Sequence, residues 1–340
     1  MPINVGVIGA GVMGADHVRQ LSRSVPGARV AVVADLDAER AGRVAGGAGA
    51  RSTSDAGAVI ADPGVDAVVI ASHDSTHAEL VTACLDAGKP VLCEKPLAPA
   101  VDDCRRIVAA DERWVAEHGS SLITLGFMRR FDPAHAQLRS GLEAGQWGRP
   151  LMAHCISRNV ASARGATTAS AITNSAIHEL DSMPWLFGSP VREVCWVPLG
   201  RSSSGAPEGL QDPAFMMLRL ANGVTATLEL FLNCRYGYST RLEVVAEDGA
   251  VEFTESPALL THRDGLRGTG YPDDWRPRFE DAYRLELTAW IDSLATVPGE
   301  GGEPHPGLAS AGDGLAACLV ADALQASMSD GGAWTAVVAS

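Results

Sequence analysis

A glycine-rich turn near the start of the chain constrains its fold more than any other feature. The sequence Gly9-Ala10-Gly11-Val12-Met13-Gly14 follows an apolar run, residues 3–8, that is typical of a buried strand, and it opens a predicted helix over residues 12–24. An acidic residue, Asp35, ends the next apolar run, 21 positions after Gly14. Strand, glycines, helix, strand and acid in this order form the fingerprint of a dinucleotide-binding βαβ unit.

Each part of the fingerprint has a physical role. Glycines allow a tight turn and let the backbone approach a pyrophosphate at the positive end of the helix. A carboxylate at Asp35 would accept hydrogen bonds from the adenine-ribose hydroxyls and repel a 2′-phosphate, which predicts NAD rather than NADP. The alternative is a glycine turn in some other α/β protein. The predicted cofactor-binding residues in this region are Gly9, Gly11, Val12, Met13, Gly14 and Asp35.

Charge and composition exclude several classes of partner. The 340 residues include 27 basic and 41 acidic side chains, a net charge of −14, which argues against nucleic acid or an anionic membrane as partner. No apolar run approaches the roughly 20 residues that a membrane-spanning helix needs, and the first strand starts at once, without a visible signal peptide. Seven scattered cysteines without a CxxC pair favour a reducing, cytoplasmic setting.

The alternation of predicted elements changes about one third of the way along the chain. The first third alternates strands and helices, which predicts a Rossmann-type, doubly wound parallel sheet. After Gly126, Asp132 as N-cap and Pro133 at the first helical position predict a helix over residues 132–144. Several strands then follow one another between residues 191 and 262, the last at 258–262, with hairpin signals at Asn222-Gly223 and Asp248-Gly249. We therefore expect an α/β chain with an NAD-binding domain over residues 1–126. An α+β domain with a mostly antiparallel open sheet is expected over residues 127–340.

A second motif, Glu94-Lys95-Pro96, follows a short predicted strand at the edge where a doubly wound sheet binds its ligand. A lysine there can reach a substrate hydroxyl near the nicotinamide, and Pro96 stiffens the backbone that presents it. The alternative on spacing alone is an exposed Lys-Pro turn.

Glu94-Lys95-Pro96 after an N-terminal GxGxxG resembles the signature of the Gfo/Idh/MocA oxidoreductases, and the resemblance covers nearly the whole chain. Within that family the chain is most similar to inositol 2-dehydrogenases. The segments that carry this closer likeness are 126–133, 175–181, 210–213 and 233–238, together with Trp275, Arg278-Phe279 and Ala282-Tyr283.

The resemblance implies a reaction and two catalytic side chains. Hydride would pass from a cyclitol carbon to nicotinamide C4, converting myo-inositol to its 2-keto product, scyllo-inosose. His178 would take the hydroxyl proton, a task suited to a side chain whose pKa lies near neutrality. Lys95 would hydrogen-bond the reacting oxygen and steady its developing negative charge.

Three positions depart from the pattern of inositol dehydrogenases. Asn174 stands where an aspartate usually precedes the histidine by four residues, so it can orient His178 but adds no charge. Ser157 stands where histidine is frequent, and Ser239 where aspartate is common. These changes favour, as an alternative, an aminocyclitol or a pyranose sugar as substrate. A non-catalytic NAD-binding regulator is the rival from another class.

The same resemblance implies the remaining site residues. Ser72, His73 and Glu94 join Lys95 as cofactor-contacting positions, and Asn174 joins the catalytic set. His73 and His77 have a spacing that could bind a metal, but no third ligand accompanies them, so no metal is expected. In this family one face of the second sheet packs between subunits, which implies a homotetramer or homodimer. The implied substrate-binding residues are Met128, Ser157, Asn159, Tyr236, Tyr238, Trp275 and Tyr283.

Overall fold

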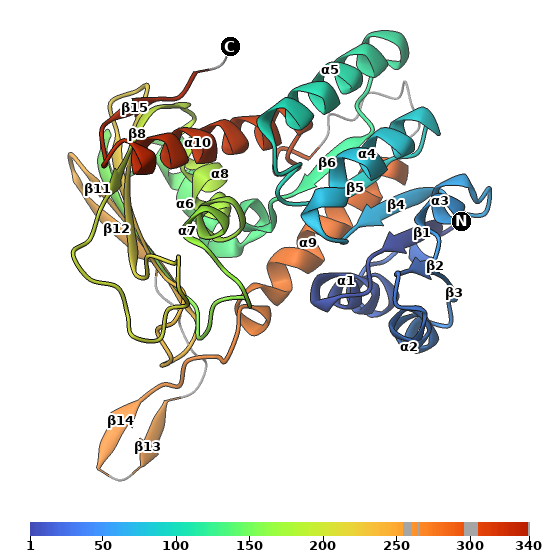
Figure 1. The fold of residues 1–340 in the computed structure, drawn as a ribbon, viewed down its shortest axis with the longest axis horizontal. Helices are drawn as coiled ribbons and strands as arrows, with labels where there is room; N and C mark the ends of the chain where they lie inside the picture. Colours follow the sequence, from blue (N-terminus) through green and yellow to red (C-terminus); the bar gives the residue numbers. More distant parts are fainter. Residues whose placement is uncertain (254–259, 264, 296–304, 339–340) are drawn as a thin grey trace. The chain divides into compact units, whose positions relative to one another are not determined.

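The computed structural model describes residues 1–253, 260–263, 265–295 and 305–338, and the chain divides into two compact units (Figure 1). The first unit contains residues 1–131 and 281–318, and the second contains residues 132–280 and 319–340.

The first unit is built on a six-stranded parallel sheet in the order β3-β2-β1-β4-β5-β6. Its strands are rich in valine and isoleucine because helices cover both faces, and all four residues of β4 are buried. This confirms the predicted Rossmann-type sheet. The strands are β1 (Ile3–Ile8), β2 (Ala28–Ala34), β3 (Arg51–Thr53), β4 (Ala67–Ile70), β5 (Val91–Glu94) and β6 (Ile123–Gly126). The helices between them are α1 (Val12–Arg23), α2 (Ala38–Ala48), α3 (Ala56–Ala61), α4 (His77–Asp86) and α5 (Val101–His118).

A late helix, α9 (Arg276–Ala295), supplies part of the core of the first unit. Its residues Leu287, Trp290 and Ile291 are buried in one cluster with Val18 and Leu21 of α1 and with the sheet. Their spacing of three and four places them on one helix face. A boundary at residue 126 was expected, whereas in the structure residues 281–318 return to the first unit.

The following helix, α10 (Ala311–Ser329), starts in the same unit. Ala309 pairs with Leu125 at the end of β6, with an N–H to carbonyl distance of 2.9 Å. A Cβ on Gly314 would lie 2.7 Å from Leu125 and 3.0 Å from Leu97, so only a glycine lets α10 pass this closely.

The second unit is built on a seven-stranded sheet in the order β12-β11-β7-β10-β9-β8-β15. Every pairing is antiparallel except the one between β7 and β10, which confirms the mostly antiparallel sheet. Buried and partly exposed residues alternate along β9 and β10, as expected when one face is packed. The strands are β7 (Pro150–Arg158), β8 (Val191–Val197), β9 (Ala214–Leu220), β10 (Thr225–Phe231), β11 (Ser239–Ala246), β12 (Gly249–Phe253) and β15 (Thr335–Ala336).

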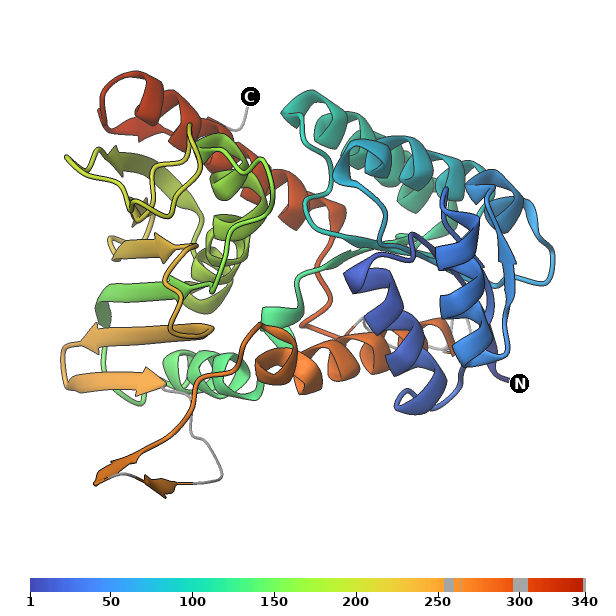
Figure 2. The same cartoon turned by 60° about the horizontal axis from the view of Figure 1, so that its bottom comes forward.

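Helices lie on one face of this sheet (Figures 1 and 2). Asp132 caps α6 (Pro133–Glu143) as predicted, accepting the backbone N–H of His135, and the two hairpin turns at Asn222 and Asp248 are confirmed. The expected strand over residues 258–262 lies partly outside the described residues, which include a small hairpin of β13 (Thr261–Arg263) and β14 (Leu266–Gly268). The helices of the packed face are α6 (Pro133–Glu143), α8 (Ile177–Phe187) and residues 319–329 of α10.

Candidate functional site

The three motif glycines of the first unit have separable roles. Gly9 has a φ of +96°, and a Cβ on it would lie 2.5 Å from the backbone of Ala71. A Cβ on Gly14 would lie 1.8 Å from the carbonyl oxygen of Gly9. Around Gly11, by contrast, no described atom would lie within 4 Å of such a Cβ. The packing of the backbone therefore requires glycine at positions 9 and 14, whereas the structure leaves open space around Gly11.

That open space adjoins the start of α1. Gly11 is the N-cap residue, and among the described residues no side chain caps this helix end and no acidic residue lies in its first turn. The positive end of a twelve-residue helix is thus left for an external anion. The exposed Val12 and the half-buried Met13 form the first helical positions. These features fit the pyrophosphate of NAD.

Asp35, just after β2, is the second element of this half-site. Its side chain is 8% exposed and accepts the backbone N–H of Ala10 in the glycine turn at 2.7 Å. Arg40 of α2 forms an ion pair with it at 2.6 Å. The hydrogen bond from Arg40 is the main reason that the pKa of Asp35 is lowered to about 2. Sequence reasoning missed Arg40, whose signal is an arginine in the first turn of the helix after the acid.

Lys95 follows β5 on a segment that is otherwise buried. From Val91 to Ala98 every residue is buried except Lys95, which is half-exposed, and the peptide bond to Pro96 is cis. Glu94 is 5% exposed and lies 2.8 Å from Nε2 of the buried His17 of α1. Burial raises the pKa of Glu94, but the His17 hydrogen bond and the nearby charges of His17 and Lys95 outweigh it, and the pKa is lowered.

Carbonyl groups fix the rest of this segment. Nδ1 of the buried His77 lies 2.7 Å from the carbonyl oxygen of Pro96, and its Nε2 lies 3.3 Å from that of Ser72. The thiols of Cys104 and Cys318 each donate to the carbonyl of Ala98 at 3.6 Å. The lysine is therefore presented from a backbone that is held on both sides.

The loop after β4 contains Ser72 and His73. The hydroxyl of Ser72 lies 2.7 Å from that of Thr76, and Nδ1 of the exposed His73 lies 2.9 Å from the hydroxyl of Ser75. The neighbouring His77, which sequence reasoning considered only as a metal ligand, joins this loop to the one that carries Lys95. No group of three or more His, Cys, Asp or Glu side chains that could hold a metal occurs among the described residues.

Two predicted substrate-binding residues belong to the first unit. Met128 is buried in a short 3₁₀ turn, Met128–Phe131. Tyr283 of α9 is 3% exposed, and its ring meets that of His17 edge-on at 5.9 Å between centroids. The structure thus brings Tyr283 of α9 beside the His17–Glu94 pair of the first unit.

His178 is the second residue of α8 in the second unit and is half-buried. The preceding residues, Ala171–Ala176, form a π-helical turn that follows α7 (Thr168–Ser170). Asn174 lies in this turn and is exposed. Residues 171–187 are thus helical throughout, first in π and then in α geometry, and the orientation of His178 by Asn174 stays a prediction.

Buried amide and carboxylate groups tie the loops of this unit together. Asp212, which is 1% exposed, accepts the backbone and side-chain N–H groups of Asn233 at 3.0 and 2.7 Å. The side-chain oxygen Oδ1 of Asn233 accepts the backbone N–H of Ser162 at 3.1 Å, and Cys234 donates its backbone N–H to the carbonyl of Asn159 at 3.0 Å. The matched segments 210–213 and 233–238 thus supply a scaffold that holds Asn159, a role that sequence reasoning did not assign.

The same scaffold reaches the turn that carries Asn174. The Thr168 hydroxyl donates to the carbonyl of Gly209 at 3.1 Å and accepts the N–H of Gln211 at 2.8 Å. Hydrogen bonds therefore link the loop that ends at Asp212 to the start of α7.

The two tyrosines before β11 have different environments. Tyr238 is 6% exposed and Tyr236 is 51% exposed, with its ring 5.3 Å from that of Tyr271. Two positions apart, Tyr236 and Tyr238 would share one face of a strand, but β11 begins only at Ser239. Gly237 has a φ of +139°, and a Cβ on it would lie 2.1 Å from Cβ of Tyr271, so the chain turns here.

The remaining predicted positions lie in the same unit. Ser157 is buried on β7, opposite Leu230 and Thr240, and Ser239 is buried opposite Arg158. Trp275 immediately precedes α9 and is half-buried, and its carbonyl accepts the N–H of Phe279.

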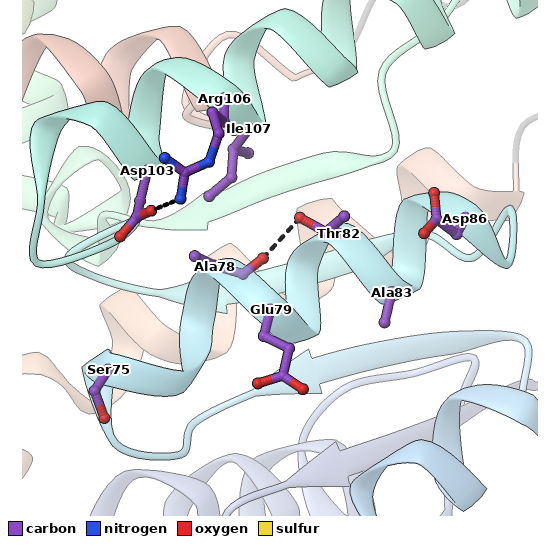
Figure 3. A pocket seen from close by; sticks show the side chains of 9 residues that line it. All are labelled: Ser75, Ala78, Glu79, Thr82, Ala83, Asp86, Asp103, Arg106 and Ile107. Carbon is purple, nitrogen blue, oxygen red and sulfur yellow. Dashed lines mark hydrogen bonds and ion pairs between the residues drawn. The ribbon is translucent and has the colours of Figure 1, made fainter.

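An open groove of about 520 Å³ lies between α4 and α5 of the first unit (Figure 3). Glu79 and Asp86 of α4 and the ion-paired Asp103 and Arg106 of α5 line it, and a hydrogen bond joins Thr82 to the carbonyl of Ala78. None of the predicted site residues lines this groove.

In the part of the chain that the structure describes, no helix has the length and apolar character needed to cross a membrane.

Comparison with known proteins extends these observations. Residues 3–115 match the oxidoreductase family with an NAD-binding Rossmann fold, and residues 135–252 match the GFO/IDH/MocA C-terminal domain. The chain is 56% identical over 337 residues to inositol 2-dehydrogenase 2 of Paenarthrobacter aurescens, with 99% of both chains covered. It is 41% identical to the inositol 2-dehydrogenase/D-chiro-inositol 3-dehydrogenase of Shouchella clausii, covering 95% of this chain and 91% of that one.

A solved structure gives the same result at the level of the fold. The myo-inositol dehydrogenase of Lactobacillus casei, in complex with NAD(H) and myo-inositol, superposes with a TM-score of 0.91 at 30% identity, covering 100% of this chain and 98% of that one. The glycine turn and the acid after β2 are placed as in the dinucleotide-binding fingerprint. The chain therefore belongs to the GFO/IDH/MocA oxidoreductase family and is an NAD-dependent dehydrogenase that acts on a CH–OH group.

Proposed function

We propose that the enzyme oxidises a secondary alcohol of a cyclitol, myo-inositol to its 2-keto product, scyllo-inosose. The observation that carries this proposal is the full-length identity of 56% to an inositol 2-dehydrogenase. The likeness to a myo-inositol dehydrogenase solved with NAD(H) and myo-inositol supports it.

The proposed roles of the residues follow from their chemistry. NAD, when bound, accepts the hydride that leaves the alcohol carbon, and Gly11, Asp35 and the start of α1 would hold it. His178 takes the hydroxyl proton on its imidazole nitrogen. Lys95 donates a hydrogen bond to the same oxygen, whose negative charge grows as the proton leaves. The hydrogen-bonded backbone around Lys95 supports this role, because a fixed cation needs little reorganisation during the reaction.

The other predicted contacts remain part of this proposal. Ser72, His73 and Glu94 would support or contact the cofactor. The polyol hydroxyls would be bound by residues from the set Met128, Ser157, Asn159, Tyr236, Tyr238, Trp275 and Tyr283.

Substitution of the two central residues tests the assignment. We expect His178→Ala and Lys95→Met each to lower kcat for myo-inositol by about 100-fold or more, the usual contribution of a positioned proton acceptor or charge donor. NAD affinity of His178→Ala, measured by calorimetry, should stay within about threefold of the parent, since this side chain is assigned to the substrate. Full activity of His178→Ala would contradict the proton-transfer role.

An aminocyclitol or a pyranose sugar is the second candidate substrate. The uncharged Asn174, Ser157 and Ser239 support it, because they lie where inositol dehydrogenases usually carry ionisable side chains. Absorbance of the reduced nicotinamide, followed with a panel of inositols, aminocyclitols and aldoses, decides between the candidates. Turnover of an aldose without turnover of any cyclitol would overturn the main proposal. NAD binding without turnover of any polyol would indicate a non-catalytic regulator instead.

We further propose that the protein forms a homodimer or homotetramer through the second face of the seven-stranded sheet. Neighbouring outward residues on this face include Ile156, Phe215, Met217 and Val245, all half-buried. Partly exposed apolar side chains gathered on an outward sheet face, here beside the polar Thr227 and Glu229 of β10, are typical of subunit interfaces. The cytoplasmic location stays a prediction, supported by seven cysteines that are all free thiols.

A further inference from the structure

The loop that presents Lys95 is anchored on both sides by histidines from different helices. Before the lysine, the carboxylate of Glu94 lies 2.8 Å from Nε2 of His17 on α1. After it, the carbonyl oxygen of Pro96 lies 2.7 Å from Nδ1 of His77, the first residue of α4. The two rings are 0% and 1% exposed, whereas Lys95 is half-exposed. Neither histidine takes part in the proton or hydride transfer proposed above.

The hydrogen-bond partners of His77 indicate which of its nitrogens carries the proton. Nδ1 lies 2.7 Å from the carbonyl oxygen of Pro96, and Nε2 lies 3.3 Å from that of Ser72. A carbonyl can only accept a hydrogen bond, and a neutral imidazole has a single N–H. We therefore assign the N–H to Nδ1, the nitrogen with the shorter contact. His77 donates this N–H to Pro96, next to Lys95.

His77 also connects the Lys95 loop to the predicted cofactor half-site. Its helix follows the loop that contains Ser72, and the backbone of that loop lies against the glycine turn. A Cβ on Gly9 would lie 2.5 Å from the carbonyl of Ala71 and 2.5 Å from the backbone nitrogen of Ser72. Direct contacts therefore lead from the glycine turn through Ser72 and His77 to the residue that follows Lys95.

We propose that His77 is a positioning residue for Lys95: by donating its Nδ1 N–H to the Pro96 carbonyl, it fixes the loop that presents the lysine against the loop that contains Ser72. Without this donor the buried carbonyl must find another partner, and the loop moves to do so. A displacement of about 1 Å at a reacting centre can lower a rate about 100-fold. This inference rests on the proposed role of Lys95 and adds a residue that acts through it.

Three substitutions at position 77 separate the donor from the volume of the ring. The amide nitrogen of asparagine can take the place of Nδ1, that of glutamine can take the place of Nε2, and leucine fills the space without a donor. His77→Asn therefore keeps the contact with Pro96, and His77→Gln and His77→Leu lose it. His118→Leu is the matched control: Nδ1 of His118 on α5 lies 3.0 Å from the carbonyl of Trp114, but this ring is exposed and outside the candidate site.

Turnover of myo-inositol at saturating NAD is the first measurement. We expect His77→Leu and His77→Gln to lower kcat about 10- to 100-fold, with KM for myo-inositol changed by less than about threefold. His77→Asn and His118→Leu should keep kcat within about threefold of the parent. In a Lys95→Met background, His77→Leu should lower kcat by less than about twofold further, because a residue that acts only through Lys95 has nothing left to position.

Amide hydrogen exchange of the cofactor-free protein is the second measurement, and it does not depend on turnover. Loss of one buried hydrogen bond should raise the exchange rate of residues 91–98 about tenfold in His77→Leu and His77→Gln. The rate should stay at the parent value in His77→Asn and His118→Leu. Should His77→Leu fail to fold, the comparison of His77→Asn with His77→Gln applies in both measurements.

The possible results separate this proposal from the proposed function. The positioning role is overturned if His77→Gln and His77→Leu keep the kcat of the parent, if His77→Asn loses as much activity as they do, or if exchange of residues 91–98 is the same in all variants. Equal losses from His77→Leu in the parent and in Lys95→Met would show a merely structural role. A fully active Lys95→Met refutes the role of the lysine, and the positioning role with it. A parent that does not turn over myo-inositol refutes only the proposed substrate, and the same comparison is then made with the polyol that the substrate panel identifies.

Discussion

Within the glycine turn, Gly14 and Gly11 are required by the motif for different physical reasons. A methyl group on Gly14 would collide with the carbonyl of Gly9 at 1.8 Å, whereas one on Gly11 would meet no described atom within 4 Å. The backbone of Gly11, with φ −67° and ψ −162°, is accessible to alanine. Only one of the two positions is therefore constrained by the folded chain alone.

This difference gives a paired prediction. Gly14→Ala should lower the free energy of unfolding by about 1–3 kcal/mol, the cost of overpacking, even without cofactor. Gly11→Ala should leave the melting temperature unchanged but weaken NAD binding by about tenfold or more, because the added methyl enters the space that a pyrophosphate would take. Calorimetric unfolding and NAD titration measure the two effects. A destabilised Gly11→Ala with normal NAD affinity would show that the assignment is reversed.

Asn174 carries no charge where a carboxylate could act on His178. A carboxylate near His178 would favour the protonated imidazole and strengthen it as a base. We expect Asn174→Asp to raise the plateau of kcat for myo-inositol and to move the acidic limb of the pH profile to higher pH. Asn174→Ala removes the amide without adding charge. It should neither raise the plateau of kcat nor move the acidic limb of the pH profile to higher pH. An unchanged pH profile for Asn174→Asp would mean that this side chain does not act on His178.

Elements are joined by a buried charge cluster at the start of α6. Asp132 is 3% exposed, pairs with Arg278 at the start of α9 at 2.6 Å, and lies 2.6 Å from Nδ1 of His135. Burial raises the pKa of Asp132, but the hydrogen bonds from His135 and Arg278 outweigh it, and the pKa is held well below its usual range. The cluster fixes the beginning of α6 to the beginning of α9 within the second unit.

Asp132→Asn keeps the helix cap but removes this charge, and should lower the free energy of unfolding by about 3 kcal/mol at pH 7, as for other broken buried pairs. A depressed folded-state pKa contributes stability that is fully present above the unfolded value of about 3.9 and is lost as the pH falls further. The difference in melting temperature from the parent should therefore be constant from about pH 7 to pH 5 and shrink below about pH 4. Asp281→Asn, in an exposed pair with Arg284, should cost less than about 1 kcal/mol. An equal loss in the free energy of unfolding for Asp132→Asn and Asp281→Asn would contradict the stabilising role of the buried Asp132 pair.

The elements also show what sequence could and could not predict. Strands such as β4 and β5 and the cap at Asp132 were predictable because their signals are local: apolar runs, and a capping residue followed by proline. The π turn at 171–176 was not, since nothing in its composition distinguishes it from an α turn. The environments of Tyr236 and Tyr238 depend on a close approach of Tyr271, which lies more than thirty positions away.

On the scale of the whole molecule, the two units share a chain that passes between them three times. The division after residue 131, and again after 280 and 318, was outside the reach of local patterns because it depends on which core the faces of α9 and α10 join. Leu287, Trp290 and Ile291 could have completed either hydrophobic core by composition alone. The surroundings of Asp35 likewise could not be predicted from local patterns. The acid of the fingerprint is visible in the sequence, but the four hydrogen bonds that its carboxylate accepts, two of them from Arg40, are not.

The face of the seven-stranded sheet that lies opposite the helices provides the last prediction. Phe215 lies across Glu229 of β10 from Ile156 of β7, and Met217 lies across Thr227 from His154. If this face joins two copies, Met217→Glu with Phe215→Glu places like charges in a desolvated interface, which costs several kcal/mol and should convert the oligomer to a monomer. Light scattering after size exclusion measures the mass, and circular dichroism establishes that the fold is kept. Leu266→Glu, at an exposed apolar position on β14, is the control and should leave the mass unchanged. A parent protein that is monomeric at micromolar concentration would refute the interface, as would a double variant that keeps the mass of the parent oligomer.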